Sequence, residues 1–284
     1  MFSVHPKLQL EQPRLMAIIN ATPDSFSDGG ALYKNQKVDR EATLLRLEQV
    51  VNEGADIIDI GGESTRPGAE PVSVQEEMDR VLPVVEWALA ETDLAVSIDT
   101  SSPELIRAAA AVGAHMINDV RALSRAGAID AVVESQLPVC LMHMQGAPRS
   151  MQQSPSYQAV VDDVATYLES RIAACVDAGI ALSKLCIDPG FGFGKTLKHN
   201  LLLLAYLEKL SRLGCPVLVG LSRKSMIDHL LGRDVGERLY ASLALGLMSL
   251  ERGAAILRVH DVRATRDIID SFIAVTDCAS LSEV

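Results

Sequence analysis

Eight short apolar segments alternate with helical patterns along this chain, and they constrain its fold more than any other feature. Each segment is almost continuously apolar, which is typical of parallel strands that are covered on both faces. We expect strands at residues 15–20, 56–60, 94–99, 115–119, 138–142, 184–188, 216–220 and 255–259. Helices are expected between them, at 43–52, 129–135, 157–178, 200–212, 237–251 and 264–275.

Signals for helix ends support this alternation. Ser73 and Glu76 have the spacing of a capping box at the start of another helix. Pro103 suits the first position of the helix after the third strand, and Gly113 suits the left-handed cap that closes it. These signals place a helix after each of the second and third strands.

A strand followed by a helix about eight times, without a polar linker, predicts one α/β domain, a single (β/α)8 TIM barrel. The length of 284 residues is close to the roughly 250 typical of that fold. We expect the domain to span 1–284, with the barrel core at about 15–275. An open, doubly wound sheet is the structural alternative.

The composition disfavours several classes of protein. The net charge is −11, whereas a nucleic-acid-binding protein needs a basic face. The apolar runs are too short to span a membrane, and the first residues lack the apolar core of a signal peptide. The 5 cysteines are scattered and predict neither a metal site nor a disulfide framework. We therefore expect a cytoplasmic protein with small-molecule substrates and no nucleic-acid or membrane partner.

Polar residues stand where most of the expected strands give way to loops. In a parallel barrel the carboxyl ends of all strands open at one mouth, so these side chains would line a single pocket. The set consists of Asn20, Asp99, Asn118, Asp188, Lys224, Arg258 and His260. A positive rim on an acidic protein suits a phosphorylated substrate.

Three of these residues, Asp99, Asn118 and Asp188, are costly to bury unless hydrogen bonds satisfy them. One explanation is that they pair with Lys224 or with backbone amides. The other is a flat heterocycle whose ring-edge amine and amide groups donate to the carboxylates. Such recognition rejects analogues that lack those donors.

Two early loops carry further candidates. Residues 20–30 are rich in turn formers, yet they include Phe26, which has no obvious core to enter, so we expect a lid that closes over a ligand. Residues 61–68 place Thr65 and Arg66 between glycines. That setting favours anion binding over a simple surface ion pair.

A later glycine-rich turn contains Gly194 and Lys195, which resemble the end of a phosphate-binding P-loop. We reject that interpretation because Pro189 stands where the motif requires glycine. The turn is expected instead to present Asp188 and to set Phe193 near the mouth. His143 is given no role.

The loop after the seventh strand holds Ser222, Arg223 and Lys224. Loops at this position in such barrels often bind phosphate, and Ser222 and Lys224 suit that role. Arg223 is expected to be merely solvated at the start of a helix.

Taken together, these motifs resemble those of bacterial dihydropteroate synthases. The segments that match are 20–30 (NATPDSFSDGG), 59–69 (DIGGESTRPGA), 97–100 (SIDT), 117–119 (IND), 141–145 (LMHMQ), 188–194 (DPGFGFG), 222–225 (SRKS) and 258–260 (RVH). The resemblance implies a TIM-barrel transferase of class EC 2.5.1 that joins 4-aminobenzoate to 6-hydroxymethyl-7,8-dihydropterin diphosphate in folate biosynthesis. It also implies dependence on Mg²⁺, a homodimer and a target of sulfonamides.

Carried over position by position, the resemblance implies roles for individual residues. Those expected to hold the pterin are Asp99, Asn118, Asp188 and Lys224, with Phe193 nearby. Those expected around the diphosphate are Thr65, Arg66, Arg258 and His260, with Asn20 acting through Mg²⁺. Those expected to frame the 4-aminobenzoate are Phe26, Pro67 and Ser222. The expected catalytic residues are Arg66, Lys224, Arg258 and His260.

Departures from the family pattern are small. Its first motif usually reads Gly-Ile-Leu-Asn-Val-Thr, whereas residues 17–22 here read Ala-Ile-Ile-Asn-Ala-Thr. Because Ala17 and Ala21 change little apolar volume, we expect activity to be kept. The rival hypotheses are a pterin-dependent methyltransferase and a catalytically silent pterin-binding protein. The stretch 237–251 is apolar nearly all round, which suits either deep burial or an oligomer face.

Overall fold

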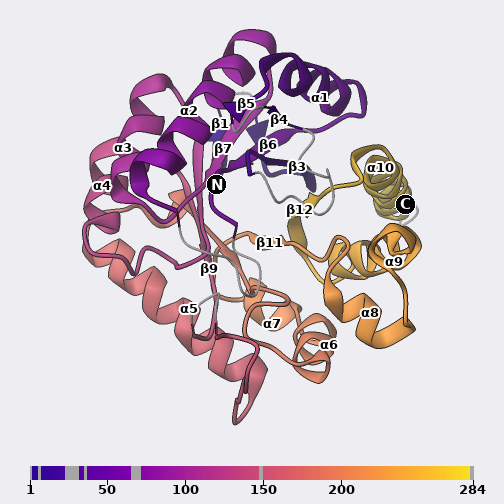
Figure 1. Ribbon diagram of the computed structural model, residues 1–284. Helices are drawn as coiled ribbons and strands as arrows, with labels where there is room; N and C mark the ends of the chain where they lie inside the picture. Colours follow the sequence, from indigo (N-terminus) through magenta and orange to yellow (C-terminus); the bar gives the residue numbers. More distant parts are fainter. Residues whose placement is uncertain are drawn as a thin grey trace.

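The computed structural model describes residues 2–5, 8–22, 32–34, 37–64, 72–146 and 150–281. Within them, eight parallel strands close into a barrel that is surrounded by helices (Figure 1). The barrel strands are β3 (Arg14–Asn20), β6 (Ile57–Gly61), β7 (Ala95–Asp99), β8 (Met116–Asp119), β9 (Val139–Met142), β10 (Leu185–Asp188), β11 (Val217–Val219) and β12 (Ala254–Val259). The predicted (β/α)8 barrel is confirmed, and the open sheet is wrong because β12 pairs with β3.

Helices follow the barrel strands and cover the outside of the barrel. They are α1 (Arg40–Asn52), α2 (Val74–Glu91), α3 (Pro103–Val112), α4 (Ala128–Ser135), α5 (Val160–Asp177), α6 (Leu197–Ala205), α7 (Glu208–Ser211), α8 (Ser225–Leu231), α9 (Leu239–Leu250) and α10 (Val262–Leu281). Two short hairpins complete the described strands, β1 (Ser3–His5) with β2 (Leu8–Gln9) and β4 (Tyr33–Lys34) with β5 (Lys37–Val38). None of the helices described is both long enough and apolar enough to cross a bilayer.

Three details differ from the sequence-based expectations. The helix expected at 200–212 is divided into α6 and α7, because the backbone leaves helical geometry at Tyr206, with φ −117° and ψ 29°. A helix was expected to start near Arg223, but the bounds of α8 were not predicted. At the start of α2, the Ser73 hydroxyl accepts from the Glu76 amide at 3.2 Å, but the Glu76 carboxylate pairs with Arg80 one turn later. The capping box is therefore only half formed.

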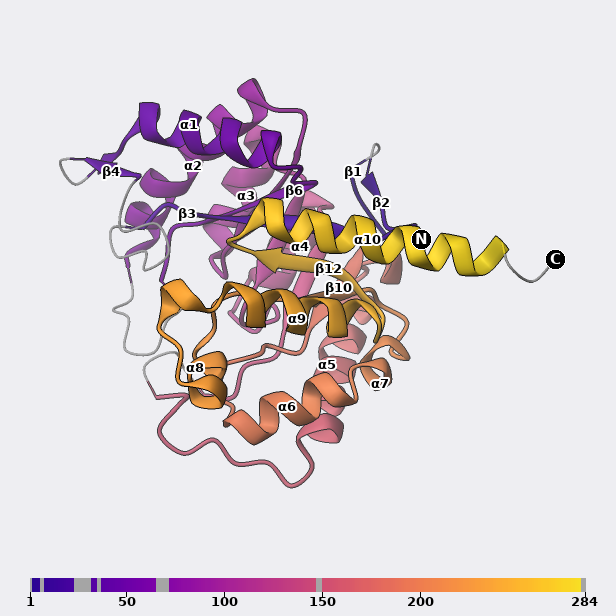
Figure 2. The same ribbon diagram turned by 90° about the vertical axis from the view of Figure 1, so that its right-hand side faces the viewer.

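The lower interior of the barrel is a solid apolar layer. Each of the eight strands contributes one buried side chain to it, because successive residues of a strand point alternately inward and outward. The layer consists of Met16, Ile57, Ala95, Met116, Cys140, Cys186, Leu218 and Ile256, and Phe2 packs onto it beside the β1–β2 hairpin. Figure 2 shows this hairpin at the end of the barrel opposite to β4 and α8. A ligand site inside the barrel must therefore lie above this layer, towards the carboxyl ends of the strands.

The packing of this layer makes a stability prediction. Met116 is completely buried in it, so Met116→Ala removes a thioether side chain and leaves a cavity. We expect the free energy of unfolding in urea to fall by about 2–5 kcal/mol. Leu45 on α1 is the control, since its side chain is 62% exposed and Leu45→Ala creates no cavity. An equal effect of both substitutions would contradict the description of a close-packed layer.

Candidate active site

A guanidinium held between two carboxylates forms the floor of the barrel mouth. Arg258 on β12 donates from Nε to Asp59 Oδ2 at 2.6 Å and from Nη2 to Asp99 Oδ2 at 2.7 Å. Asp59 lies on β6 and is completely buried, and Asp99 ends β7. Burial opposes the charge of Arg258, but Asp59 and Asp99 outweigh it and raise the pKa of the guanidinium. Arg258 is therefore a permanent cation at the centre of the floor.

Unlike Arg258, Asp99 changes its protonation state near neutral pH. Burial raises the pKa of Asp99 to about 7, since it outweighs the opposing attraction of Arg258 and is reinforced by the negative charge of Asp59. Near neutral pH this carboxyl group can accept a proton or release one. A ligand that donates a hydrogen bond to Asp99 would favour its charged form.

Asn118, on β8, has its side-chain amide oriented by Asp59. Its Nδ2 donates to Asp59 Oδ2 at 2.9 Å, and a carboxylate can only accept. The amide oxygen of Asn118 is consequently left to accept from another donor. Sequence reasoning did not single out Asp59 as a site residue, although the pattern Ile57, Asp59, Gly61 places an acid on the inward face of an apolar strand.

Two buried polar atoms in this floor have no hydrogen-bond partner among the described residues: Asp59 Oδ1 and Ser97 Oγ. Asp59 on β6 is paired with Ser97 on β7. Ser97 precedes Asp99 by two residues, so the two side chains lie on the same face of β7. Unsatisfied buried oxygens are uncommon and costly. Hydrogen-bonding capacity is thus concentrated at the base of the mouth.

Asp188 and Lys224 form the opposite side of the floor. Asp188 ends β10, and its Oδ1 accepts from the Gly190 amide at 2.7 Å. Burial raises the pKa of Asp188, while this hydrogen bond and Lys224 lower it. Lys224 donates to the carbonyl of Phe191, and its Nζ lies 4.2 Å from the centre of the Phe193 ring. Burial lowers the pKa of Lys224 to about 8, although Asp188 opposes that shift.

The turn after β10 owes its shape to glycine and to the buried amino group of Lys195. Gly190 has φ +69°, and a Cβ there would lie 1.9 Å from the carbonyl oxygen of His143, so no other residue fits. Lys195 Nζ donates to the carbonyls of Gly190 and Phe193 and lies on His143 Nδ1, each at 2.9 Å. The side chain of Lys195 therefore stabilises the turn from inside. Sequence reasoning rejected it as a phosphate ligand but did not foresee this role.

Ser222 and His260 lie at the rim. The backbone amide of His260 donates to Ser222 Oγ at 3.2 Å, and His260 Nδ1 lies at the same distance from that oxygen. Asn20 ends β3 beside Gly61 of β6 and is partly exposed. The expectation that Arg223 is merely solvated is wrong, because its guanidinium forms an ion pair with Asp261.

The structure thus gathers the described candidates from six strands at one mouth. Sequence reasoning also named residues that lie outside the described part of the chain, namely Phe26, Thr65, Arg66 and Pro67. Among the described residues, no group of three or more His, Cys, Asp or Glu side chains could hold a metal ion. The arrangement can accept several donors from a flat ring and can offer two cations to an anion beside it.

Comparisons with known proteins identify the family of this chain. Residues 16–260 match the family model of pterin-binding enzymes. The chain is 52% identical over 265 residues to the dihydropteroate synthase of Escherichia coli, covering 93% of this chain and 92% of that one. The structure of the Yersinia pestis dihydropteroate synthase in a sulfonamide drug complex has a TM-score of 0.91 and 47% identity, covering 95% of this chain and 96% of the other. That of the Xanthomonas albilineans enzyme with 4-aminobenzoic acid has a TM-score of 0.87 and 50% identity, covering 95% of each chain. This chain belongs to the pterin-binding enzymes, and among them to the dihydropteroate synthases.

Proposed function

We propose that the chain condenses 4-aminobenzoate with 6-hydroxymethyl-7,8-dihydropterin diphosphate, which gives 7,8-dihydropteroate and pyrophosphate in folate biosynthesis. The reaction is a transfer of an alkyl group from a phosphate oxygen to an arylamine nitrogen. The observation that carries the proposal is the floor in which Asp99, Asn118 and Asp188 lie beside the fixed cation Arg258. The Xanthomonas albilineans relative was solved with 4-aminobenzoic acid, and we infer that this chain binds the same acceptor.

We propose that the pterin lies on this floor. Asp99, Asp188 and the amide oxygen of Asn118 would accept from the amine and amide groups of the ring edge. Lys224 would donate to a ring oxygen or nitrogen, and Phe193 would pack near the ring. Support comes from the burial of Asn118 and Asp188 and from the orientation that Asp59 imposes on Asn118. A ligand without those donors would leave buried acceptors unsatisfied, so selectivity should be high.

We propose that Arg66, Arg258 and His260 bind the diphosphate, with Thr65 close by. The 4-aminobenzoate would be framed by Ser222, Phe26 and Pro67. Ser222 lies against His260, and this contact supports a location of the acceptor next to the diphosphate, as the reaction requires. A sulfonamide, which resembles 4-aminobenzoate in shape, would then compete for the same place.

Asn20 is the proposed protein ligand of Mg²⁺. Mg²⁺ usually keeps several waters and is held by one or two protein oxygens together with substrate phosphates. A single amide oxygen at the end of β3 fits a cation that binds together with the diphosphate. When bound, the cation would supply Lewis-acid neutralisation of the leaving group.

The chemistry requires charge stabilisation more than a strong base. The bond between the pterin methylene carbon and the diphosphate oxygen breaks, and the electron pair leaves with the diphosphate beside Arg258 and His260. The ring releases electrons to the methylene carbon, while Asp99 and Asp188 stabilise the positive charge. The neutral arylamine nitrogen attacks this carbon and then loses a proton to solvent. Positioning and electrostatics would then account for catalysis.

We also propose that the chain forms a homodimer through α9. Tyr240 on this helix is 82% exposed, and Leu247 and Met248 are exposed as well. Deep burial therefore does not explain the apolar character of the helix, whereas an oligomer face does. We further propose a single domain over 1–284 and a cytoplasmic location, and the latter is supported by five free cysteines.

Turnover tests the proposed function directly. Purified protein with the dihydropterin diphosphate, 4-aminobenzoate and Mg²⁺ should produce dihydropteroate, detected by chromatography, and EDTA should abolish the product. Arg258→Ala should lower kcat at least about a hundredfold, because it removes the fixed cation at the leaving group. Arg107→Ala, which breaks an exposed ion pair with Glu134 on the helical shell, is the control. Pterin binding without product would favour the silent binder, and methyl transfer would favour the methyltransferase.

The pH dependence of kcat/KM for the dihydropterin diphosphate should report Lys224. Because burial lowers its pKa to about 8, its ammonium group loses a proton above that pH and can no longer donate fully to the pterin. We expect kcat/KM to fall as pH rises through about 8. In Lys224→Arg the charge does not titrate in this range, so the alkaline limb should disappear even if the rate is lower. An unchanged limb in the variant would assign it to another group.

Light scattering tests the proposed dimer. The wild-type protein should have twice the 30.5 kDa mass of one chain at micromolar concentration. Tyr240→Glu places a charge on the exposed face of α9, in its first turn, and should shift the mass to that of one chain. Leu45→Glu changes an equally apolar exposed position on α1 and should leave the dimer intact. A wild-type monomer would refute the proposal.

A further inference from the structure

The backbone between Ser222 and Lys224 adopts a strained conformation. Arg223 has φ +56°, in the left-handed region that residues with a side chain rarely adopt. A strained backbone conformation persists only where surrounding contacts stabilise it, and such conformations are common at functional sites. Here both sequence neighbours of the strained residue belong to the proposed substrate site.

Contacts on three sides hold Arg223 in place. Its backbone amide donates to Ser242 Oγ at 2.9 Å, and its carbonyl accepts from Arg238 Nη1 at 3.0 Å. Its guanidinium binds both oxygens of Asp261, with Nε at 2.9 Å from Oδ2 and Nη2 bonded to Oδ1. Ser242 is fixed in turn, because its hydroxyl donates to the carbonyl of Arg238 at 2.7 Å.

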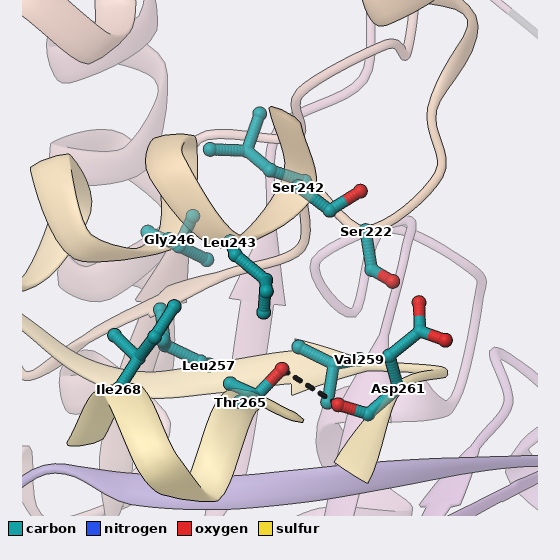
Figure 3. A pocket seen from close by; sticks show the side chains of 11 residues that line it. Ser222, Ser242, Leu243, Gly246, Leu257, Val259, Asp261, Thr265 and Ile268 are labelled. Atoms are coloured by element: carbon teal, nitrogen blue, oxygen red, sulfur yellow. Dashed lines mark hydrogen bonds between the residues drawn. The ribbon is translucent and has the colours of Figure 1, made fainter. Parts of the chain in front are cut away.

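These contacts join the loop after β11 to the loop after β12 at two consecutive positions. Ser222 Oγ accepts from the His260 amide, and Arg223 binds Asp261, the next residue along. Figure 3 shows Ser222, Ser242 and Asp261 facing one another around a small cavity. Its volume of about 10 Å³ is barely enough for one water molecule, so the two loops are closely packed.

The left-handed conformation of Arg223 also makes the side chains of Ser222 and Lys224 point in different directions. Ser222 faces His260 at the rim, whereas Lys224 reaches the Phe191 carbonyl and the Phe193 ring on the loop after β10. A right-handed or extended Arg223 would redirect the chain after Ser222. The conformation of one residue therefore decides whether both side chains reach the mouth.

We propose that Arg223 and Asp261 are positioning residues for the acceptor side of the site: their ion pair holds the strained turn that points Ser222 at 4-aminobenzoate and Lys224 at the pterin. This inference rests on the proposed function for the identity of the substrates. Partly exposed ion pairs usually contribute little. This one differs because it is bidentate, joins two active-site loops and fixes a strained residue between two substrate ligands.

Hydrogen exchange tests the positioning claim without reference to catalysis. In the wild-type protein the Arg223 amide should exchange slowly, since it is bonded to Ser242. In Asp261→Asn, which keeps the shape of the side chain, exchange at this amide should be about tenfold faster. Arg107→Ala, which breaks a comparable arginine–carboxylate pair on the helical shell, should leave it unchanged. If the wild-type amide exchanges as fast as an exposed loop amide, the proposal fails without any variant.

Steady-state kinetics tests the consequence for substrates. Asp261→Asn and Arg223→Ala should each raise KM for 4-aminobenzoate by about tenfold, with a smaller effect on kcat. The double variant should be no worse than either single variant, and Arg223→Lys should recover part of the loss. Wild-type KM in variants whose Tm is unchanged would overturn the inference. Absence of dihydropteroate from the wild-type protein, with the expected exchange pattern, would instead refute the proposed function and leave the positioning role standing.

Discussion

The contact between Arg258 and its two carboxylates, Asp59 and Asp99, is the interaction on which the rest of the site depends. It joins β12, β6 and β7 inside the barrel, at the height where apolar filling gives way to polar groups. A buried carboxylate without a partner is costly, and a buried guanidinium is no less so. Because the guanidinium and the carboxylates form ion pairs with one another, charged groups are stable in the barrel interior without a substrate. Through Asp59, the same contact also orients Asn118.

The barrel makes this arrangement possible because the residues that stabilise the fold and those that form the site lie at different heights in its interior. Eight apolar side chains and Phe2 fill the lower interior, so the amino-terminal half of the barrel is a packed core. The polar layer rests on that core and is surrounded by strands whose registers are fixed by continuous pairing. Side chains on rigid strands can be held in strained or charged states that a loop alone would not maintain. The loops then add the turn around Gly190 and the joined segments at Ser222 and His260.

Much of this could be predicted from the chain alone because its patterns are local. All eight barrel strands were expected to within two residues, since each is an almost continuously apolar run between turn formers. The polar residues at the strand ends were recognised for the same reason. The helix break at Tyr206 was missed, and the bounds of the short helix α8 were not predicted, because neither has a strong local signal. Asp59 was missed as a site residue because it lies inside a strand, whereas the search was for polar residues at strand ends.

The sequence by itself determined the barrel, the polar mouth and the family, because alternating strands and helices and ordered motifs are properties of neighbouring residues. Only the tertiary structure decided which charges meet. Asp59 and Arg258 lie 199 positions apart, and Arg223 and Asp261 lie 38 apart, so no local pattern records their pairing. Arg223 was expected to be solvated and Lys195 was given no role, whereas the fold places each against specific partners. The physical reason is that burial and distance set the strength of an electrostatic interaction, and both arise only when the barrel closes.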